Sequence, residues 1–390
     1  MIAAEVVPPA EPAVAPTSAK AAPNPAPNPA PNPSADVARE ARARHTLRGM
    51  VCAIVTKDGI ASIGADGMRR RGSPDPITVD DRMHLGSCTK AFTATLAAVL
   101  VADGTIKWDS TVGEVLGGAG AGDGAGAGGK GEPRINDAWK PVTLEDLLRH
   151  RGGAPADPQP DEWQAAFGCK TSPSECRAVF VRGIIGRAPQ QARGTHVYSN
   201  QSYAIAGRML EVAAGKDYEA LLTERVLKPL GITHAGFGQP SRIDPNSPVG
   251  HDPLGMPLDI DNPDAIAPAG KLHMPVGEWA KFIAFELGAT PPKELEGAAK
   301  LLAKMQKPGE ELPHEALGWM TANRQWGGAV LYHSGSNTKW YCSAWVAPEK
   351  GFAVLAAVNQ GGDRAQRACD EACSELIKRH TAPASPPASK

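Results

Sequence analysis

Strand patterns lie near both ends of this chain and helical patterns lie between them, and this order restricts the folds available to it. The segment GMVCAIVTKDGIASIGADG, residues 49–67, predicts two strands around a turn at Lys57, Asp58 and Gly59. Three later segments, AVLYHSG, KWYCSAWVAPEKG and GFAVLAAVNQGG, predict strands near the other end. Together they would form one antiparallel sheet of about five strands, a typical size. A helix over residues 364–380 would close the chain.

The middle of the chain predicts a second, mainly helical lobe. Leu144, Leu147 and Leu148 form an apolar stripe at helical spacing. Similar patterns run through NQSYAIAGRMLEVAAG, DYEALLTERVLKPLG and VGEWAKFIAFELG. The expected fold class is therefore α+β, with a sheet flanked by helices and joined to a helical lobe. A cleft between two such lobes is a common place for a ligand pocket.

Composition divides the chain into a tether, a domain and a tail. Residues 1–45 include AAPNPAPNPAPNPS, whose repeated prolines predict an extended, disordered tether. We expect one folded domain over residues 46–382, interrupted by a flexible glycine-rich surface loop at 117–133. Residues 383–390 are expected to form a disordered tail.

Charge and hydropathy exclude several classes of partner. The 390 residues are 42% hydrophobic and carry a formal net charge of −1, so they can bury a large core but offer no basic stripe for nucleic acid. No apolar run approaches the ~18 residues of a membrane span, and no signal peptide is evident at the start. A tether ahead of a folded domain nevertheless suits an exported protein. We therefore expect a periplasmic or secreted monomer, with a cytoplasmic location as the alternative.

The seven cysteines are an odd number, so they cannot all pair within the chain. Cys169 and Cys176 bracket the polar segment KTSPSE, which a disulfide could close. Cys369 and Cys373 stand four residues apart on the last predicted helix, where packing is their expected role. No cysteines and histidines have zinc-site spacing, and His-Glu-x-x-His does not occur. We expect no metal and no cofactor.

The segment GSCTKAF, residues 86–92, places Ser87 and Lys90 three positions apart at the start of a predicted helix. Positions i and i+3 share a helix face, so the amine would lie within reach of the hydroxyl, which suits proton transfer. The alternative is structural, with Ser87 as a helix cap and Lys90 in solvent. The helix dipole disfavours a cation in the first turn, which argues against the structural alternative.

Two further segments carry polar groups that a cleft could use. THVYSNQSYAIAGRMLE places Tyr198 and Asn200 just before a predicted helix. LYHSGSNTKW places His333, Ser334 and Gly335 at a strand end. Taken separately, the first is typical of a turn with a helix cap and the second of an ordinary strand end.

The joint order of these motifs resembles the serine β-lactamase and penicillin-binding-protein superfamily. Ser-x-x-Lys comes first, Tyr-x-Asn follows in the middle of the chain, and His-x-Gly lies on a late strand. The most similar branch is class C-like: class C β-lactamases, D-alanyl-D-alanine carboxypeptidases, D-aminopeptidases and related carboxylesterases. VTLEDLLRHRGGAP, VLKPLGITHAGFG and APAGKLHMPVGEWAKF also resemble segments of that branch. The resemblance covers roughly residues 46–380 and implies a two-lobed β-lactamase/transpeptidase-like fold.

This resemblance implies a covalent mechanism. Ser87 would attack the substrate carbonyl to give an acyl-enzyme, which divides one difficult step into two. Lys90 is a candidate base, because desolvation can bring the pKa of a lysine toward neutrality. Tyr198 would share the proton relay, and either residue could take the hydroxyl proton. Asn200 would hold Lys90 and the substrate amide.

The resemblance also implies a substrate site along the late strand. The backbone N–H groups of Ser87 and Ser336 would form an oxyanion hole. His333 would lie near the leaving group or a substrate carboxylate, with Ser334 as a hydrogen-bond partner and Gly335 beside them. Lactamases usually carry Lys-Thr-Gly where this chain has His-Ser-Gly, and the histidine form is commoner among the peptidases.

We therefore expect a serine hydrolase that acts on amide or ester carbonyls, with a D-amino-acid peptide or an ester as its substrate. A class C-like β-lactamase is the alternative. A non-catalytic penicillin-binding sensor is a third possibility, which a missing motif residue would have favoured. An α/β-hydrolase would need a Gly-x-Ser-x-Gly elbow, and the chain contains none.

Overall fold

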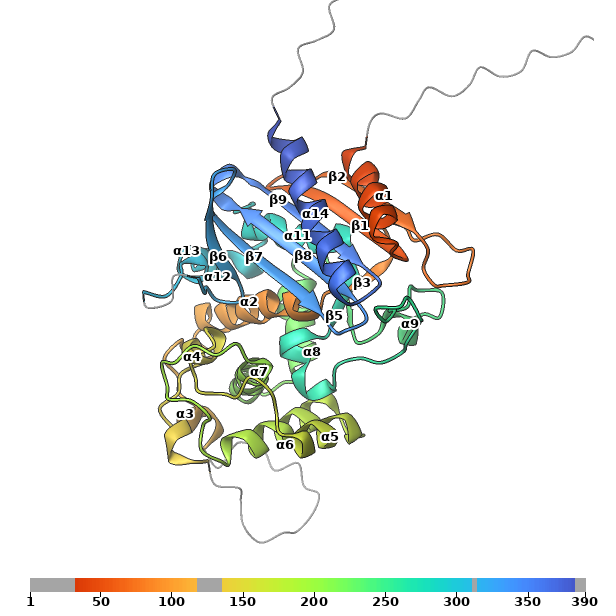
Figure 1. The fold of residues 1–390 in the computed structure, drawn as a ribbon. Coiled ribbons are helices and arrows are strands. Elements are labelled where there is room, and N and C mark those ends of the chain that lie inside the picture. The colour runs from red at the N-terminus through yellow and green to blue at the C-terminus, as the bar shows by residue number, and fades with distance from the viewer. Residues whose placement is uncertain (1–31, 118–134, 311–313, 383–390) are drawn as a thin grey trace, which may run out of the picture. The chain divides into compact units, whose positions relative to one another are not determined.

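Six antiparallel strands in the order β2-β1-β9-β8-β7-β6 form the main sheet (Figure 1). They are seen in a computed structural model that describes residues 32–117, 135–310 and 314–382. The expected tether up to residue 31, the tail over 383–390 and all of the glycine-rich loop except Gly117 lie outside the described residues.

The main sheet contains the five expected strands and one more. Its strands are β1 Gly49–Thr56, β2 Gly59–Gly67, β6 Met320–Arg324, β7 Gly328–Ser336, β8 Tyr341–Ala347 and β9 Phe352–Val358. A smaller sheet, in the order β3-β5-β4, contains β3 Arg82–His84, β4 Gly236–Phe237 and β5 Leu272–Pro275. The additional strand β6 lies at the sheet edge and reads MTANR, whose alternation rests on only two apolar residues, Met320 and Ala322, too few to predict a strand.

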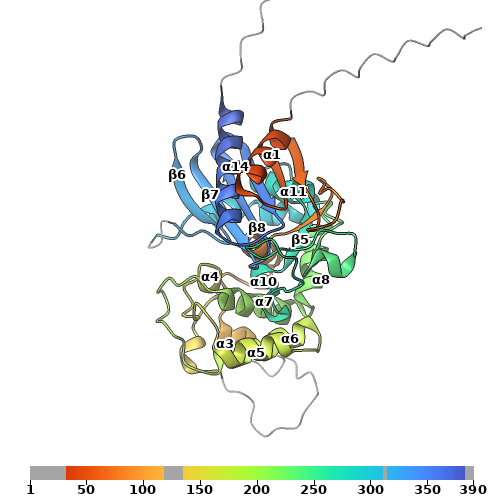
Figure 2. The ribbon, with the colours of Figure 1, turned by 45° about the vertical axis from the view of Figure 1, so that its right-hand side comes forward.

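Helices cover both faces of the sheet, and the interior strand β1 is apolar on both sides for that reason. Met50 and Ile54 pack into the core formed with helices α1 and α14, whereas Val51 and Val55 pack into the core on the other face. Successive strand residues point to opposite faces, so a strand covered on both faces reads as a continuous apolar run. Figure 2 shows α1 and α14 on one side of the sheet and α11 on the other.

Helix α1, Pro33–His45, corrects the expected domain boundary at residue 46. It packs on β1, β2 and α14 and buries Val37, Ala38 and Ala41. Asn32 caps it, since the Asn32 side chain accepts a hydrogen bond from the Ala35 N–H. The helix carries a weak sequence signal because its buried face consists of small side chains, directly after a proline-rich run.

The remaining helices build the flank of the sheet and the expected helical lobe. They are α2 Thr89–Ala102, α3 Val112–Leu116, α4 Leu144–Leu148, α5 Pro160–Gly168, α6 Pro173–Ile185, α7 Asn200–Ala214, α8 Tyr218–Leu222, α9 Pro240–Ile243, α10 Ala267–Gly270, α11 Val276–Glu286, α12 Glu296–Ala299, α13 Leu302–Gln306 and α14 Asp363–Thr381. Among the described residues, no helix combines the length and the apolarity that crossing a membrane requires.

Helix α2 lies between the sheet and the helical lobe and is buried on all sides (Figure 1). Every residue from Thr89 to Leu100 is buried, which explains why TKAFTATLAAVL is apolar around the whole helix circumference. A short 3-10 turn, η1 Gly86–Cys88, precedes it. Ser87 therefore lies at the N-terminal end of this buried helix.

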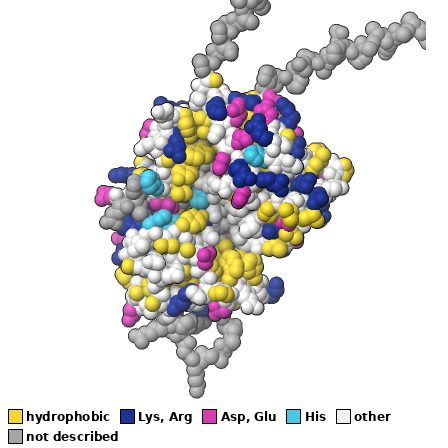
Figure 3. Space-filling view, viewed as in Figure 1, with side chains coloured by type: hydrophobic (Ala, Val, Ile, Leu, Met, Phe, Trp, Pro, Cys, Tyr) yellow, Lys and Arg dark blue, Asp and Glu magenta, His cyan; other side chains and the backbone are white. Residues whose placement is uncertain are grey.

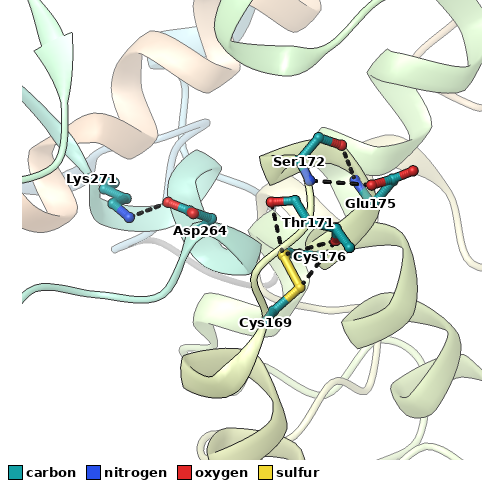
Figure 4. The surroundings of a disulfide bond; sticks show 7 residues. All are labelled: Cys169, Thr171, Ser172, Glu175, Cys176, Asp264 and Lys271. Atoms are coloured by element: carbon teal, nitrogen blue, oxygen red, sulfur yellow. Dashed lines mark hydrogen bonds and ion pairs between the residues drawn. A yellow bond between two sulfur atoms is a disulfide. The ribbon is translucent and has the colours of Figure 1, made fainter.

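A disulfide joins Cys169, just after α5, to Cys176 in the first turn of α6 (Figure 4). It closes the polar loop identified from the sequence. Ser172 caps α6 in the same loop, because its side chain accepts a hydrogen bond from the Glu175 N–H. Cys369 and Cys373 are buried on α14 as free thiols, in keeping with a packing role.

Candidate active site

The turn that carries Ser87 lies in direct contact with strand β7. Gly86 has a φ of +47°, a left-handed conformation that favours glycine. A Cβ atom at this position would lie 2.3 Å from the backbone nitrogen of Ser336. At Gly335, a Cβ atom would lie 1.9 Å from the carbonyl oxygen of Leu85. Two glycines thus allow the backbones of η1 and β7 to touch.

This contact uses a part of β7 that has a partner on one side only. The ladder with β6 ends at the pair Tyr332 and Met320, whereas the ladder with β8 continues to Ser336. From His333 to Ser336, the other edge of β7 therefore faces η1. The backbone of Ser336 and the N–H groups at the start of the helix come together at the predicted oxyanion hole.

The Lys90 amine is held at three points in the core of the site. Nζ lies 3.2 Å from Ser87 Oγ, 2.8 Å from Asn200 Oδ1 and 2.9 Å from the carbonyl oxygen of Ala269. The residue is fully buried. A neutral amine has two N–H bonds and one lone pair, so it can donate to the two carbonyl oxygens and accept the Ser87 hydroxyl proton.

Burial lowers the pKa of Lys90 from 10.5 to about 7. Cys88 and Glu315 oppose this effect because negative charge at either position favours the ammonium form. A pKa near neutrality gives the amine a substantial neutral fraction at physiological pH. Lys90 therefore satisfies both requirements of a general base, namely contact with the hydroxyl and a suitable pKa.

Tyr198 lies over the same amine, with Lys90 Nζ 4.7 Å from its ring centroid. Burial raises the pKa of Tyr198 above its ordinary value of 10, and a hydrogen bond with the Ser87 side chain lowers it in part. The residue still exposes 38% of its surface, so the ring reaches the edge of the site. A phenol of this kind keeps its proton at neutral pH and can donate it.

The segment before α7 places both motif residues of Tyr-x-Asn. The intervening Ser199 caps α7, because its side chain accepts a hydrogen bond from the Ser202 N–H at 3.2 Å. The structural interpretation considered for this triplet thus holds for Ser199. It leaves Tyr198 just outside the helix and Asn200 in the first turn, where its amide oxygen reaches Lys90.

The alternation of β7 separates two of the predicted site residues. His333 pairs with Ala344 and Gly335 with Cys342, and Cys342 Sγ lies 3.5 Å from Cys88 Sγ next to the nucleophile turn. These positions share the face toward the site. The His333 and Tyr198 ring centroids are 6.3 Å apart. His333 Nδ1–H donates to the Ser334 carbonyl oxygen at 2.7 Å, which fixes the orientation of the ring.

Ser334 does not join the site with its side chain, contrary to the expectation from sequence. Ser334 pairs with Ser343, and its hydroxyl forms a hydrogen bond with Tyr341, which packs on the α14 side. Because successive strand residues point to opposite faces, the Ser334 side chain faces away from Ser87. Only its carbonyl oxygen serves the site, through His333. The Ser336 side chain donates instead to the Trp340 carbonyl oxygen at 2.9 Å.

Several residues of the site were absent from the sequence predictions. The Ala269 carbonyl oxygen holds Lys90, and His150 contacts the Tyr198 segment. Glu315 is buried nearby, and desolvation raises its pKa to about 8. The RHRGG turn, which resembles a family segment, could have drawn attention to His150. Figure 3 shows histidine side chains gathered where the sheet and the helical lobe meet.

Comparisons with known proteins place these observations in a wider context. The family profile described as Beta-lactamase matches residues 34–372. The chain is 27% identical over 338 residues to "Penicillin-binding protein 4" of Amycolatopsis lactamdurans, covering 82% of this chain and 83% of that protein. It is 25% identical over 349 residues to "Unguisins hydrolase ungD'" of Aspergillus campestris, covering 83% of this chain but only 61% of that protein.

Solved structures share the fold at lower sequence identity. A class C beta lactamase from Rhodobacter sphaeroides superposes with a TM-score of 0.70 at 20% identity, covering 90% of this chain and 100% of that one. An octameric penicillin-binding protein homologue from Pyrococcus abyssi superposes with a TM-score of 0.68 at 20% identity, covering 87% of this chain and 75% of that one. The two-lobed fold expected from the sequence is confirmed.

Proposed function

Because this chain belongs to the beta-lactamase family, it is a serine hydrolase, and we propose that Ser87 is its nucleophile. The observation that carries the proposal is the buried Lys90 amine, which has a pKa of about 7 and lies 3.2 Å from Ser87 Oγ. A charged surface lysine would offer no lone pair to the hydroxyl. Here the amine is neutral often enough to accept its proton.

In the acylation step that we propose, Lys90 accepts the Ser87 proton while Ser87 Oγ bonds to the substrate carbonyl carbon. The oxyanion then collapses and breaks the bond to the leaving group. Tyr198, whose pKa is raised by burial, donates a proton to the leaving nitrogen or oxygen and recovers one from Lys90. A water molecule attacks the acyl-enzyme in the same manner and restores Ser87.

The backbone N–H groups of Ser87 and Ser336 are proposed to bind the oxyanion. The close contact at Gly86 and Gly335 supports this role, because it brings the two backbone segments together. Preorganised donors of this kind are worth roughly 3–4 kcal/mol of transition-state stabilisation each where one has been removed. His333 borders the same space, with its Nδ1–H donated to the Ser334 carbonyl oxygen.

For the substrate, we propose a D-amino-acid peptide or an ester in preference to a β-lactam. A lysine in place of His333 would offer a permanent positive charge to the carboxylate of a penicillin or cephalosporin, which an imidazole does not provide. One relative, from Escherichia coli O157:H7, is named "Putative D-alanyl-D-alanine carboxypeptidase" and is 28% identical over 175 residues. A class C-like β-lactamase is the second candidate.

A substrate panel tests this proposal. Wild-type protein is assayed with a D-Ala-D-Ala peptide, a short-chain nitrophenyl ester and a chromogenic cephalosporin, beside Ser87→Ala and the control Ser374→Ala, an exposed serine on α14. We expect the peptide or the ester to give the highest kcat/KM, and all turnover to be lost in Ser87→Ala alone. Cephalosporin turnover well above the other two would favour the β-lactamase candidate. Activity in Ser87→Ala would refute the nucleophile.

We also propose that the protein works as a monomer in the periplasm or outside the cell. The Cys169–Cys176 disulfide supports an oxidising compartment, since such bonds persist there. Peptide mapping of protein from its native host should find these two cysteines joined, and two free thiols would contradict export. Light scattering should give the mass of a single chain. An assembly like that named for the Pyrococcus abyssi relative would contradict the monomer.

A further inference from the structure

His150 contacts the backbone on both sides of Tyr198. The Val197 N–H donates to the His150 carbonyl oxygen at 2.9 Å, and the Ser199 N–H donates to His150 Nδ1 at 3.0 Å. The His150 ring also lies against the Tyr198 ring, with centroids 4.5 Å apart. One residue thus holds the backbone N–H of the residue before the tyrosine, the N–H of the residue after it, and one face of its ring.

The backbone of His150 is in an unusual conformation that makes this contact possible. Its φ is +57°, in the left-handed region that non-glycine residues seldom occupy. Such conformations cost of order 1–3 kcal/mol and persist where the surrounding structure holds them. The residue is 2% exposed, so its ring reaches the Tyr198 segment from inside the lobe.

Glu315 lies on the other side of the same imidazole. Its side-chain oxygens lie 3.8 Å from His150 Nε2 (Oε1) and 3.3 Å from His196 Nε2 (Oε2). Its carbonyl oxygen accepts a hydrogen bond from Arg149, so Arg149 contacts the backbone of Glu315 while the ring of the next residue, His150, faces its side chain. His150 Nδ1 accepts a hydrogen bond from the Ser199 N–H, so the neutral ring carries its proton on Nε2. That Nε2–H faces Glu315.

We propose that His150 is the positioning residue for Tyr198, and that Glu315 fixes the His150 tautomer by facing its Nε2–H. This inference rests on the proposed role of Tyr198 in proton transfer. If the tautomer changed, Nδ1–H would meet the Ser199 N–H, and the segment carrying Tyr198 would move away. Burial lowers the pKa of His150 well below 6.5, and Lys90, His196 and His333 lower it further, so the imidazole stays neutral.

The tautomer can be observed directly in the wild-type protein by nitrogen-15 NMR of labelled histidine. We expect His150 to show an unprotonated Nδ1 and a protonated Nε2 at pH 7. The resonances are assigned by their loss in His150→Asn. In Glu315→Leu, the Nε2–H tautomer should lose population, whereas Glu315→Gln should keep it through its amide oxygen. A protonated Nδ1 in the wild type would overturn the proposal, whatever the variants do.

Kinetics with the nitrophenyl ester test the positioning role. Asparagine tolerates the left-handed backbone, and its side-chain oxygen can accept the Ser199 N–H, whereas alanine can do neither. We expect His150→Ala to lower kcat about a hundredfold, the scale of a 1 Å misplacement, with KM within about threefold. His150→Asn should recover about tenfold of that loss. If both variants are folded and equally impaired, or both unimpaired, the positioning role is wrong.

One further variant, His196→Gln, and a comparison with Ser87→Ala separate this inference from the proposed function. His196→Gln removes another histidine beside Glu315 but no hydrogen bond to the Tyr198 segment, so its kcat should stay within about threefold of wild type. An equally large loss of kcat in His196→Gln and His150→Ala would show that the effect comes from any histidine beside Glu315 and not from the hydrogen bond to Ser199, and it would contradict the positioning role. Loss of activity in Ser87→Ala beside an unimpaired His150→Ala would refute this inference and leave the proposed function intact.

Discussion

Replacing Lys90 with methionine should make the protein more stable than the wild type near neutral pH. This advantage over the wild type should shrink as the pH rises. In the folded protein the pKa of Lys90 is lowered from 10.5 to about 7. Between these values the unfolded chain holds a proton that the folded chain has released. The wild-type free energy of unfolding therefore rises with pH in this window, by about 1.4 kcal/mol per pH unit. Methionine removes this dependence and fills a similar volume.

The size of the effect follows from the same pKa. At pH 7.5, burial of the amine costs the wild type about 4 kcal/mol, and at pH 9 about 2 kcal/mol. The variant loses the hydrogen bonds to Asn200 and Ala269, each worth about 1 kcal/mol. We expect Lys90→Met to be about 2 kcal/mol more stable than the wild type at pH 7.5 and equal to it at pH 9, with no turnover at either pH.

Urea unfolding at pH 6, 7.5 and 9 at constant ionic strength measures this difference. Lys57→Met, an exchange of an exposed lysine in the β1–β2 turn, serves as the matched control and should follow the wild type at every pH. Below pH 7 the difference in unfolding free energy between Lys90→Met and the wild type should become constant, because Lys90 is then protonated in both the folded and the unfolded chain. Parallel stability profiles from pH 7.5 to 9 would show that Lys90 titrates normally, and the argument for its role as base would fail.

Three other variants test separate parts of the site and the fold. Gly335→Ala places a Cβ atom 1.9 Å from the Leu85 carbonyl oxygen, so β7 must move from the nucleophile turn, and kcat/KM for the ester should fall about a hundredfold; wild-type activity would show that this contact does not matter. His333→Lys should raise cephalosporin turnover relative to the neutral ester by about ten- to a hundredfold, and an unchanged ratio would exclude His333 as the determinant of preference. The double exchange of Cys169 and Cys176 to serine should lower the free energy of unfolding by about 2 kcal/mol, from the loop entropy released, as measured by urea unfolding; equal stability would indicate that the bond contributes nothing.

The parts of the site that were predictable are those encoded locally. Ser87 and Lys90 share a helix face, so their contact follows from spacing alone. Tyr198 and Asn200 could be assigned only through the family resemblance, because no local sequence pattern indicates that their segment contacts α2. Glu315 had no signal at all, because its contacts depend on where distant segments meet in the folded protein.

Two errors could have been avoided with elementary geometry. Adjacent strand residues face opposite sides, so His333 and Ser334 could not both direct their side chains into one site. The domain boundary was placed too late because a proline-rich composition was extended into ADVAREARARH, where Val37 and Ala41 already stand four residues apart. Strand β6 was a different case, since a five-residue edge strand with only two apolar residues carries almost no pattern of its own.

The most direct test of the account is to locate the covalent intermediate. Protein incubated with a fluorophosphonate or a β-lactam, then digested and analysed by mass spectrometry, should carry one adduct on Ser87, and Ser87→Ala should carry none. Cys88 is adjacent but buried, so the alanine variant leaves no accessible substitute in the turn. An adduct on any other residue, or undiminished labelling of Ser87→Ala, would contradict the assignment of the nucleophile and the mechanism built on it.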